Sequence, residues 1–177
     1  MNDYQHYLGQ VIGSNVLALA LIALALTRPR IARWIAGCGL IAASIANTLV
    51  IVANPQGYIT GYGALVWPIY RGIIYGPFAA HPLLYVRLIA AGQFISGFLT
   101  LFGRRYRRLG LLGELIFLLA IVPLGVGSAF PSTLLMAIAI AILIRQASGK
   151  KRRRGAAMLT RQEIQHAPVS PHHDCAA

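Results

Sequence analysis

The sequence is poor in charged residues and poorest in acids. Of its 177 residues, 11% are charged and four are acidic. A typical soluble domain has about 25% charged residues, so this composition argues against an ordinary soluble globule. The hydrophobic content of 57% argues equally against a disordered chain. We therefore expect a small multi-span membrane protein, and the length allows one domain.

Cysteine and catalytic motifs are also scarce. Cys38 lies in a predicted span and Cys175 in the C-terminal tail, so a disulfide between them is not expected. The sequence holds no phosphate-binding loop, dinucleotide fingerprint, nucleophile elbow or His-Glu-x-x-His motif. It therefore predicts no catalytic residue, no metal site and no resident cofactor, and it leans away from an enzyme.

Long apolar runs dominate what is present. A membrane-spanning helix needs about 20 predominantly apolar residues. Five runs approach or meet this length: residues 8–27, 34–53, 86–103, 109–126 and 130–144. The segment 54–85 differs, because it contains four prolines and six tyrosine or tryptophan residues. Aromatic rings of this kind concentrate at headgroup level and proline interrupts helices, so we predict an interfacial segment of short helices and turns.

The basic residues fix the predicted orientation. They form three clusters: Arg28, Arg30 and Arg33; Arg104, Arg105, Arg107 and Arg108; and Arg145, Lys150, Lys151, Arg152, Arg153, Arg154 and Arg161. With five spans, these 14 of the 16 basic residues share one side of the membrane. A sixth span across residues 59–80 would separate the first cluster from the others. The positive-inside rule thus favours five spans in the cell membrane, with the N-terminus outside and the C-terminus in the cytoplasm.

These features predict an all-α membrane helix bundle over residues 1–146 and a basic, disordered cytoplasmic tail over 147–177. The basic clusters also predict contact with anionic lipid headgroups. Nucleic acid is not expected as a partner, because no aromatic residues interleave the basic run 150–154. The histidines near the C-terminus, with Asp174 and Cys175, satisfy no zinc-motif spacing, and disorder is the favoured interpretation of this stretch.

Glu114 stands out because it lies inside the fourth predicted span. A carboxylate at the centre of a span costs about 2.5–3.5 kcal/mol on insertion scales, so such a group usually faces water or a partner. One interpretation is a proton-accepting or ligand-binding group. The favoured alternative is an ion pair with an arginine of the basic turn that can reach inward: Arg104, Arg105 or Arg108.

Other polar residues predict contacts between spans. One face of the third span carries Gln93, Ser96, Gly97, Thr100 and Arg104, and the fourth span presents Gly110, Gly113 and Glu114. We expect these faces to meet as interhelical packing, with a polar cofactor pocket as the alternative. Four further residues are expected to bond across helices and, with Gln93, to be candidates for lining a polar cavity: Asn47, Thr48, Ser14 and Asn15.

Two arginines outside the clusters and one histidine lie in or beside the aromatic segment. Arg71, His81 and Arg87 fall near tyrosines on the predicted outer side. They are candidates for holding an anionic headgroup or the polar end of a quinone-like ligand. The favoured interpretation is that they anchor the segment at the membrane interface.

Residues 34–146 resemble the DoxX-like group of small membrane proteins. The resemblance is carried by His81-Pro82-Leu83-Leu84, by the run from Leu88 to Gly103, and by the basic turn Arg104-Arg105 with the Gly/Leu-rich span that follows it. Gln93 stands where that family often has a glutamate. The resemblance implies that spans two to five form a four-helix bundle with residues 8–27 as an additional helix. The family includes subunits associated with quinone-linked sulfur oxidation.

Three functions follow as hypotheses. The leading one is an accessory or structural membrane component that acts through helix packing, beside a partner membrane subunit or a second copy of itself. The second is a subunit of a quinone-linked membrane oxidoreductase, with the quinone near Gln93 and Glu114. The third is a small-molecule transporter, which the lack of an evident inverted repeat disfavours.

Overall fold

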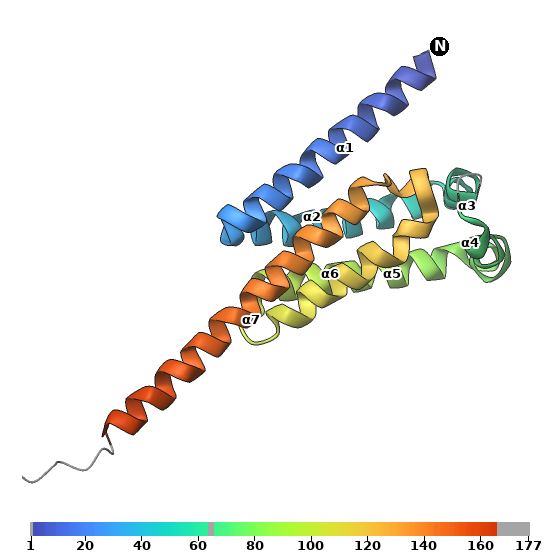
Figure 1. Ribbon diagram of the computed structural model, residues 1–177. Coiled ribbons are helices and arrows are strands. Elements are labelled where there is room, and N and C mark those ends of the chain that lie inside the picture. Colours follow the sequence, from blue (N-terminus) through green and yellow to red (C-terminus); the bar gives the residue numbers. More distant parts are fainter. Residues whose placement is uncertain (1, 64–65, 166–177) are drawn as a thin grey trace, which may run out of the picture. The chain divides into compact units, whose positions relative to one another are not determined.

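The protein consists of helices joined by short turns in the part of the chain that the computed structural model describes, residues 2–63 and 66–165 (Figure 1). The chain divides into two units, Met1–Ile144 and Arg145–Ala177. Its elements follow in this order: α1 Asn2–Thr27, α2 Pro29–Ala53, α3 Pro55–Gly63, α4 Pro68–Ile73, η1 Ile74–Phe78, α5 Pro82–Phe102, α6 Arg107–Ile121, η2 Val122–Ser128 and α7 Ser132–Gln165.

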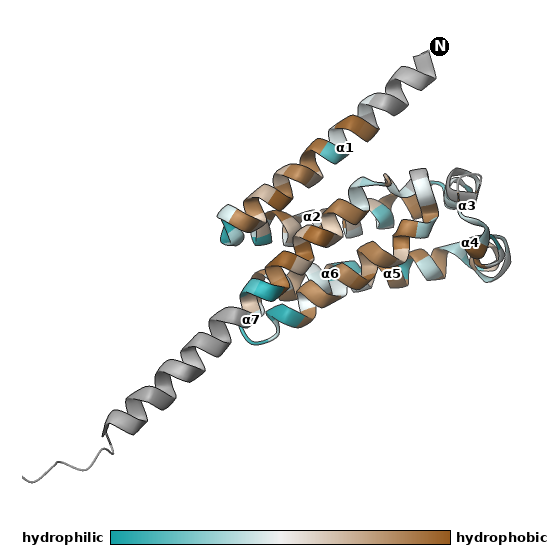
Figure 2. Cartoon of the chain, in the orientation of Figure 1, coloured by the Kyte–Doolittle hydropathy of each residue, from teal (hydrophilic) through white to brown (hydrophobic). Residues whose placement is uncertain are grey.

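Three helical stretches among the described residues are long and apolar enough to cross a membrane: Pro29–Ala53, Pro82–Phe102 and Arg107–Gly125. Two further apolar stretches, Val11–Thr27 and Ser132–Ser148, are shorter. Figure 2 shows hydrophobic residues along α2, α5 and α6, with hydrophilic residues gathered at the α1–α2 and α5–α6 turns. The chain is therefore a helical membrane protein with three clear candidate spans, and the count of five stays a prediction.

Prolines set the starts of two of these helices. The predicted spans begin at residues 34 and 86, whereas α2 begins at Pro29 and α5 at Pro82. Proline suits the first helical position, because its missing N–H would have no partner there and its φ is already helical. The apolar run therefore underestimates the length of the helix α2, which includes Arg30 in its first turn and Arg33 in its second.

Helices α2 and α5 pack antiparallel through small residues. A Cβ added to Gly37 would lie 2.7 Å from Leu101 Cγ, and one added to Gly97 would lie 2.8 Å from Gly37 O. Ser44 Oγ donates a hydrogen bond of 2.7 Å to Ala90 O further along the pair. Because the start of α2 meets the end of α5, the α1–α2 and α5–α6 turns lie at the same end of the bundle.

Helix α6 returns against α5 equally closely. A Cβ on Gly110 would lie 2.5 Å from Thr100 N, and one on Gly113 would collide with Ser96 Oγ. A core cluster then joins α1, α2, α6 and α7 of the first unit, and it includes Leu21, Ala25, Ala32, Leu111, Ala139, Ile140 and Leu143. Helix α6 ends at Ile121, where η2 brings Pro123 and a turn with Gly125 at φ 64°.

The segment 54–85 contains short helices that each follow a proline or a break. Helices α3 and α4 begin at Pro55 and Pro68, and the π-turn η1 contains Pro77. A second cluster ties this segment to the long helices through Ile51 of α2, Tyr58 of α3 and Val86 of α5. The short helices match the predicted pattern, while their position outside the membrane stays a prediction.

The second unit contains the C-terminal part of α7. Its backbone is helical as far as Gln165, whereas the sequence favoured disorder from residue 147. The stretch from Ser132 to Gln165 contains no proline, and many of its residues are good helix formers, so nothing in the chain stops the helix there. The candidate metal-ligating residues of the C-terminus, from His166 to Cys175, lie outside the described residues.

Candidate functional site

A chain of three polar side chains links α3, α2 and α5. The Tyr58 hydroxyl donates to Asn47 Oδ1 at 2.9 Å, and Asn47 Nδ2 donates to Gln93 Oε1 at 2.9 Å. Gln93 is 2% exposed and Tyr58 is 8% exposed. A buried amide without a partner would be costly, so this chain both satisfies the polar groups and fixes the three helices relative to one another.

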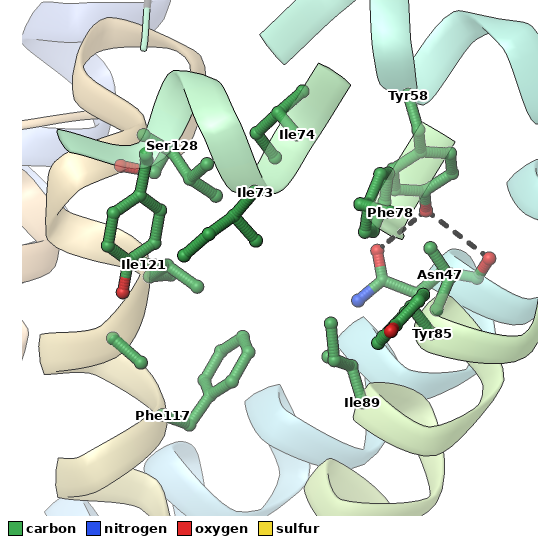
Figure 3. Close-up of a pocket in the computed structure, with 14 residues that line it drawn as sticks. Asn47, Tyr58, Ile73, Ile74, Phe78, Tyr85, Ile89, Phe117, Ile121 and Ser128 are labelled. Atoms are coloured by element: carbon green, nitrogen blue, oxygen red, sulfur yellow. Dashed lines mark hydrogen bonds between the residues drawn. The ribbon is translucent and has the colours of Figure 1, made fainter. Parts of the chain in front are cut away.

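The polar chain borders an apolar cavity of about 320 Å³ (Figure 3). Asn47 and Tyr58 form one wall, and Tyr85, Val86 and Ile89 of α5 continue it. The rest of the lining comes from the short helices and from α6 with η2: Tyr70, Ile73, Ile74, Phe78, Phe117, Ala120, Ile121, Leu124 and Ser128. The cavity therefore lies between the long helices and the segment 54–85.

The lining defines what the cavity can hold. All of its polar groups are neutral: one amide, three phenols and one hydroxyl. Asn47 Nδ2 carries two hydrogens and donates one of them to Gln93. In Figure 3 the amide nitrogen of Asn47 points away from Tyr58 toward the space between the lining side chains. Its second hydrogen is thus available to a carbonyl or hydroxyl oxygen of a neutral, lipophilic molecule.

Gln93 and Glu114 lie deeper than the cavity on their helices. Gln93 follows the lining residue Ile89 by four positions on α5, about 6 Å along the axis. Glu114 precedes the lining residue Phe117 by three positions on α6, about 4.5 Å along the axis. Gln93 bonds to α2, and neither side chain lines the cavity itself.

Glu114 is 2% exposed, and neither carboxyl oxygen has a hydrogen-bond partner among the described residues. Thr100 of α5 is the polar neighbour of the carboxyl, but the two are not in hydrogen-bond geometry. Among the described residues, the Glu114 carboxyl therefore accepts no hydrogen bond from Arg104, Arg105 or Arg108, which differs from the expected ion pair. The reason is geometric: Glu114 shares the face of α6 that carries Gly110, and this face packs against α5.

The other predicted polar contacts divide between local and interhelical bonds. Ser14 and Asn15 donate to Val11 O, and Thr48 donates to Ser44 O, so all three bond within their own helices. This differs from the expected bonds across helices. A hydroxyl or amide in a helix readily reaches a carbonyl three or four residues earlier, which satisfies it without a neighbour.

The polar face of α5 serves two neighbours. Gln93 and Gly97 face α2, while Ser96 and Thr100 face Gly110 and Gly113 of α6. Arg104 lies beyond the end of α5 and is exposed. The face therefore packs between two helices, whereas it was expected to meet α6.

The two separate arginines lie on the surface. Arg71 in α4 and Arg87 in α5 are exposed, and neither lines the cavity. Sequence reasoning identified Asn47 and Gln93 but gave Tyr58 no role beyond the aromatic segment. It also did not identify the α6 residues that line the cavity. Phe117 and Ile121 have the apolar character of any residue in a span, so nothing in the sequence distinguishes them.

Fold and site together define a helical membrane protein with a neutral, mainly apolar cavity at one end of its long helices. Among the described residues, no group of three or more histidine, cysteine or acidic side chains is placed to bind a metal ion. Comparison of the chain with protein-family models, curated proteins and solved structures gave no match.

Proposed function

We propose that the protein is an accessory, non-catalytic component of the cell membrane with five spans. The shorter apolar stretches Val11–Thr27 and Ser132–Ser148 supply the two spans beyond the three long helices. Each gives about 26 Å of helix, close to the ~30 Å thickness of the hydrocarbon core. We also propose that the chain is related to the DoxX-like group, which its sequence resembles.

The charge distribution supports an orientation with the N-terminus outside. Antiparallel packing of α2 and α5 brings the first two basic clusters to one end of the first unit, as five spans require. The cavity and the segment 54–85 lie at the opposite end of these helices. In the proposed topology the basic end faces the cytoplasm and the aromatic segment faces outward.

The observation that carries the accessory role is an exposed aromatic ridge on α5. Phe94, Phe98 and Phe102 lie next to one another along α5 with centroid distances of 6.4 and 5.0 Å, and Trp34 of α2 meets Phe102 edge-on at 6.1 Å. All four rings are 46–57% exposed, while the buried polar groups of α2 and α5 join these helices to each other. Such a ridge offers a packing surface to a partner helix.

Site-specific photocrosslinking tests this proposal. p-Benzoylphenylalanine replaces Phe98 on the ridge or Ile116 on α6, which is 66% exposed and serves as the control position. In native membranes we expect a discrete protein adduct at position 98, to a partner subunit or a second copy, and much less at 116. Lipid adducts alone at position 98, or equal protein adducts at both positions, would contradict the accessory role.

A second candidate function is favoured by the cavity. A subunit of a quinone-linked oxidoreductase needs a site for a neutral ring with carbonyl oxygens, and the lining offers apolar walls with the Asn47 amide as donor. Such a ring would lie above Gln93 and Glu114 rather than between them.

Quinone retention tests this second candidate. Ala120→Phe fills the cavity from α6, and Ala91→Phe on the exposed side of α5, away from the cavity, is the matched control. If the candidate is right, quinone co-purifies with the wild type and the control but is lost from Ala120→Phe. Failure of quinone to co-purify with the wild type would remove the candidate.

A further inference from the structure

Arginines from two helices converge at the basic end of the first unit. Arg33 lies in the second turn of α2 and Arg107 begins α6. The edge-to-face contact between Trp34 and Phe102 holds the turn that precedes α6 against the start of α2. The charge of Arg33 is within electrostatic reach of Arg107 and of Arg30, and all three charges are positive.

Both converging side chains have an unused buried donor. Within the described part of the chain, Arg33 Nε and Arg107 Nε are buried and have no hydrogen-bond partner. Like charges that are partly removed from water repel each other strongly, and an unbonded donor adds a desolvation cost. An anion between the two guanidinium groups would relieve both costs at once.

The helix ends strengthen the positive potential. Neither α2 nor α6 has an acidic residue in its first turn or a side-chain cap on its first N–H groups. Both helices therefore direct the positive ends of their dipoles toward the basic end. Two helix N-termini and two arginines from different elements thus lie at the same end of the first unit.

The protein itself supplies no anion there among the described side chains. Of the four acidic residues, Glu114 is the one whose side chain the structure describes, and its carboxyl oxygens bond to neither arginine. Arg104 and Arg105, by contrast, are exposed to solvent in the same turn. The second basic cluster therefore contains the partly buried Arg107 as well as the exposed Arg104 and Arg105.

We propose that Arg33 and Arg107 form a binding site for a phosphate-type oxyanion. Arginine presents paired N–H donors that match such an oxyanion, and charge-assisted bonds of this kind are the strong ones. The phosphate belongs either to an anionic phospholipid or to a soluble phosphate. This site deepens the proposed topology and rests on it, since the cytoplasmic leaflet carries the anionic lipids.

Thermal unfolding of the full chain in nanodiscs tests the site. The nanodiscs contain phosphatidylcholine alone, phosphatidylcholine with phosphatidylglycerol, or phosphatidylcholine with inorganic phosphate added at constant ionic strength. The test variant is Arg33→Gln with Arg107→Gln. The matched control, Arg104→Gln with Arg105→Gln, removes the same charge from exposed positions in the same turn.

We expect phosphatidylglycerol, inorganic phosphate or both to raise the Tm of the wild type and of the control. The test variant should bind the same probe about tenfold more weakly or worse. A response to phosphatidylglycerol alone assigns a lipid headgroup, and a response to inorganic phosphate assigns a soluble anion. Equal losses in test and control variants would show diffuse attraction and overturn the site, as would a wild type that responds to neither probe.

Arg33→Lys with Arg107→Lys guards against misfolding of the glutamine variant. It keeps both charges but removes the paired donors, so it should fold like the wild type and still bind the probe more weakly. Unweakened binding in this variant would overturn the assignment to guanidinium donors. Because nanodisc stability does not depend on which side is cytoplasmic, a negative result would leave the proposed topology intact.

Discussion

Gly110→Ala is the sharpest test of how α5 and α6 pack. An alanine Cβ at this position would lie 2.5 Å from Thr100 N, 2.6 Å from Thr100 Oγ1 and 2.7 Å from Ser96 O. Ordinary contacts between such atoms are about 3.5 Å, so the helices must separate by about 1 Å. Two of the three obstructing atoms are backbone atoms, which a side-chain rotation cannot remove. Overpacking of this kind costs about 1–3 kcal/mol.

Gly92→Ala isolates that packing cost. Gly92 also lies in a long helix, but a Cβ there meets nothing within 4 Å. Both substitutions gain the same helix propensity, up to about 1 kcal/mol, so the difference between the two variants is the overpacking cost alone. Unfolding in detergent micelles, followed by circular dichroism, measures it. Equal stability of the two variants would refute the close approach of α5 and α6 at Gly110.

Two further predictions concern buried polar side chains. Asn47→Leu should lower the free energy of unfolding by about 1–3 kcal/mol in the same assay, because it leaves Gln93 Oε1 without its donor. The control Thr48→Val, at an exposed position, should change the free energy of unfolding by much less. Equal losses in the two variants would count against the Tyr58–Asn47–Gln93 chain. Glu114→Gln should keep or raise the unfolding temperature, because it removes a buried carboxyl whose oxygens have no partner among the described residues. A clear fall in the unfolding temperature would show that the carboxyl has a stabilising partner.

The sequence could predict the helical class, the apolar runs and the polar residues of α2 and α5, because each depends on local composition and helical spacing. It could not predict how those residues pair. Gln93 was predicted to face α6, whereas it bonds to Asn47 of α2, on the side of α5 where Gly97 approaches Gly37. The cavity was equally hidden, since it depends on the π-turn at Ile74–Phe78 and the bend at Gly125.

The Glu114 ion pair shows a different limit. Sequence spacing places arginines within side-chain reach of Glu114, but it does not give the rotation of α6 about its axis. The glycine Gly110 on the same face determines that rotation, because it brings this face against Thr100 of α5. Gly110, one turn before Glu114, therefore determines the environment of the Glu114 carboxyl.

Cysteine accessibility tests the central claim, a membrane bundle whose aromatic segment and basic end lie on opposite faces. Tyr75 and Tyr106 are exposed in these two regions, 57% and 54% respectively, and each is replaced by cysteine in a Cys38→Ser, Cys175→Ser background. A membrane-impermeant maleimide should label Tyr75→Cys in intact cells and Tyr106→Cys only after permeabilisation. Labelling of both positions from the same side would contradict the account.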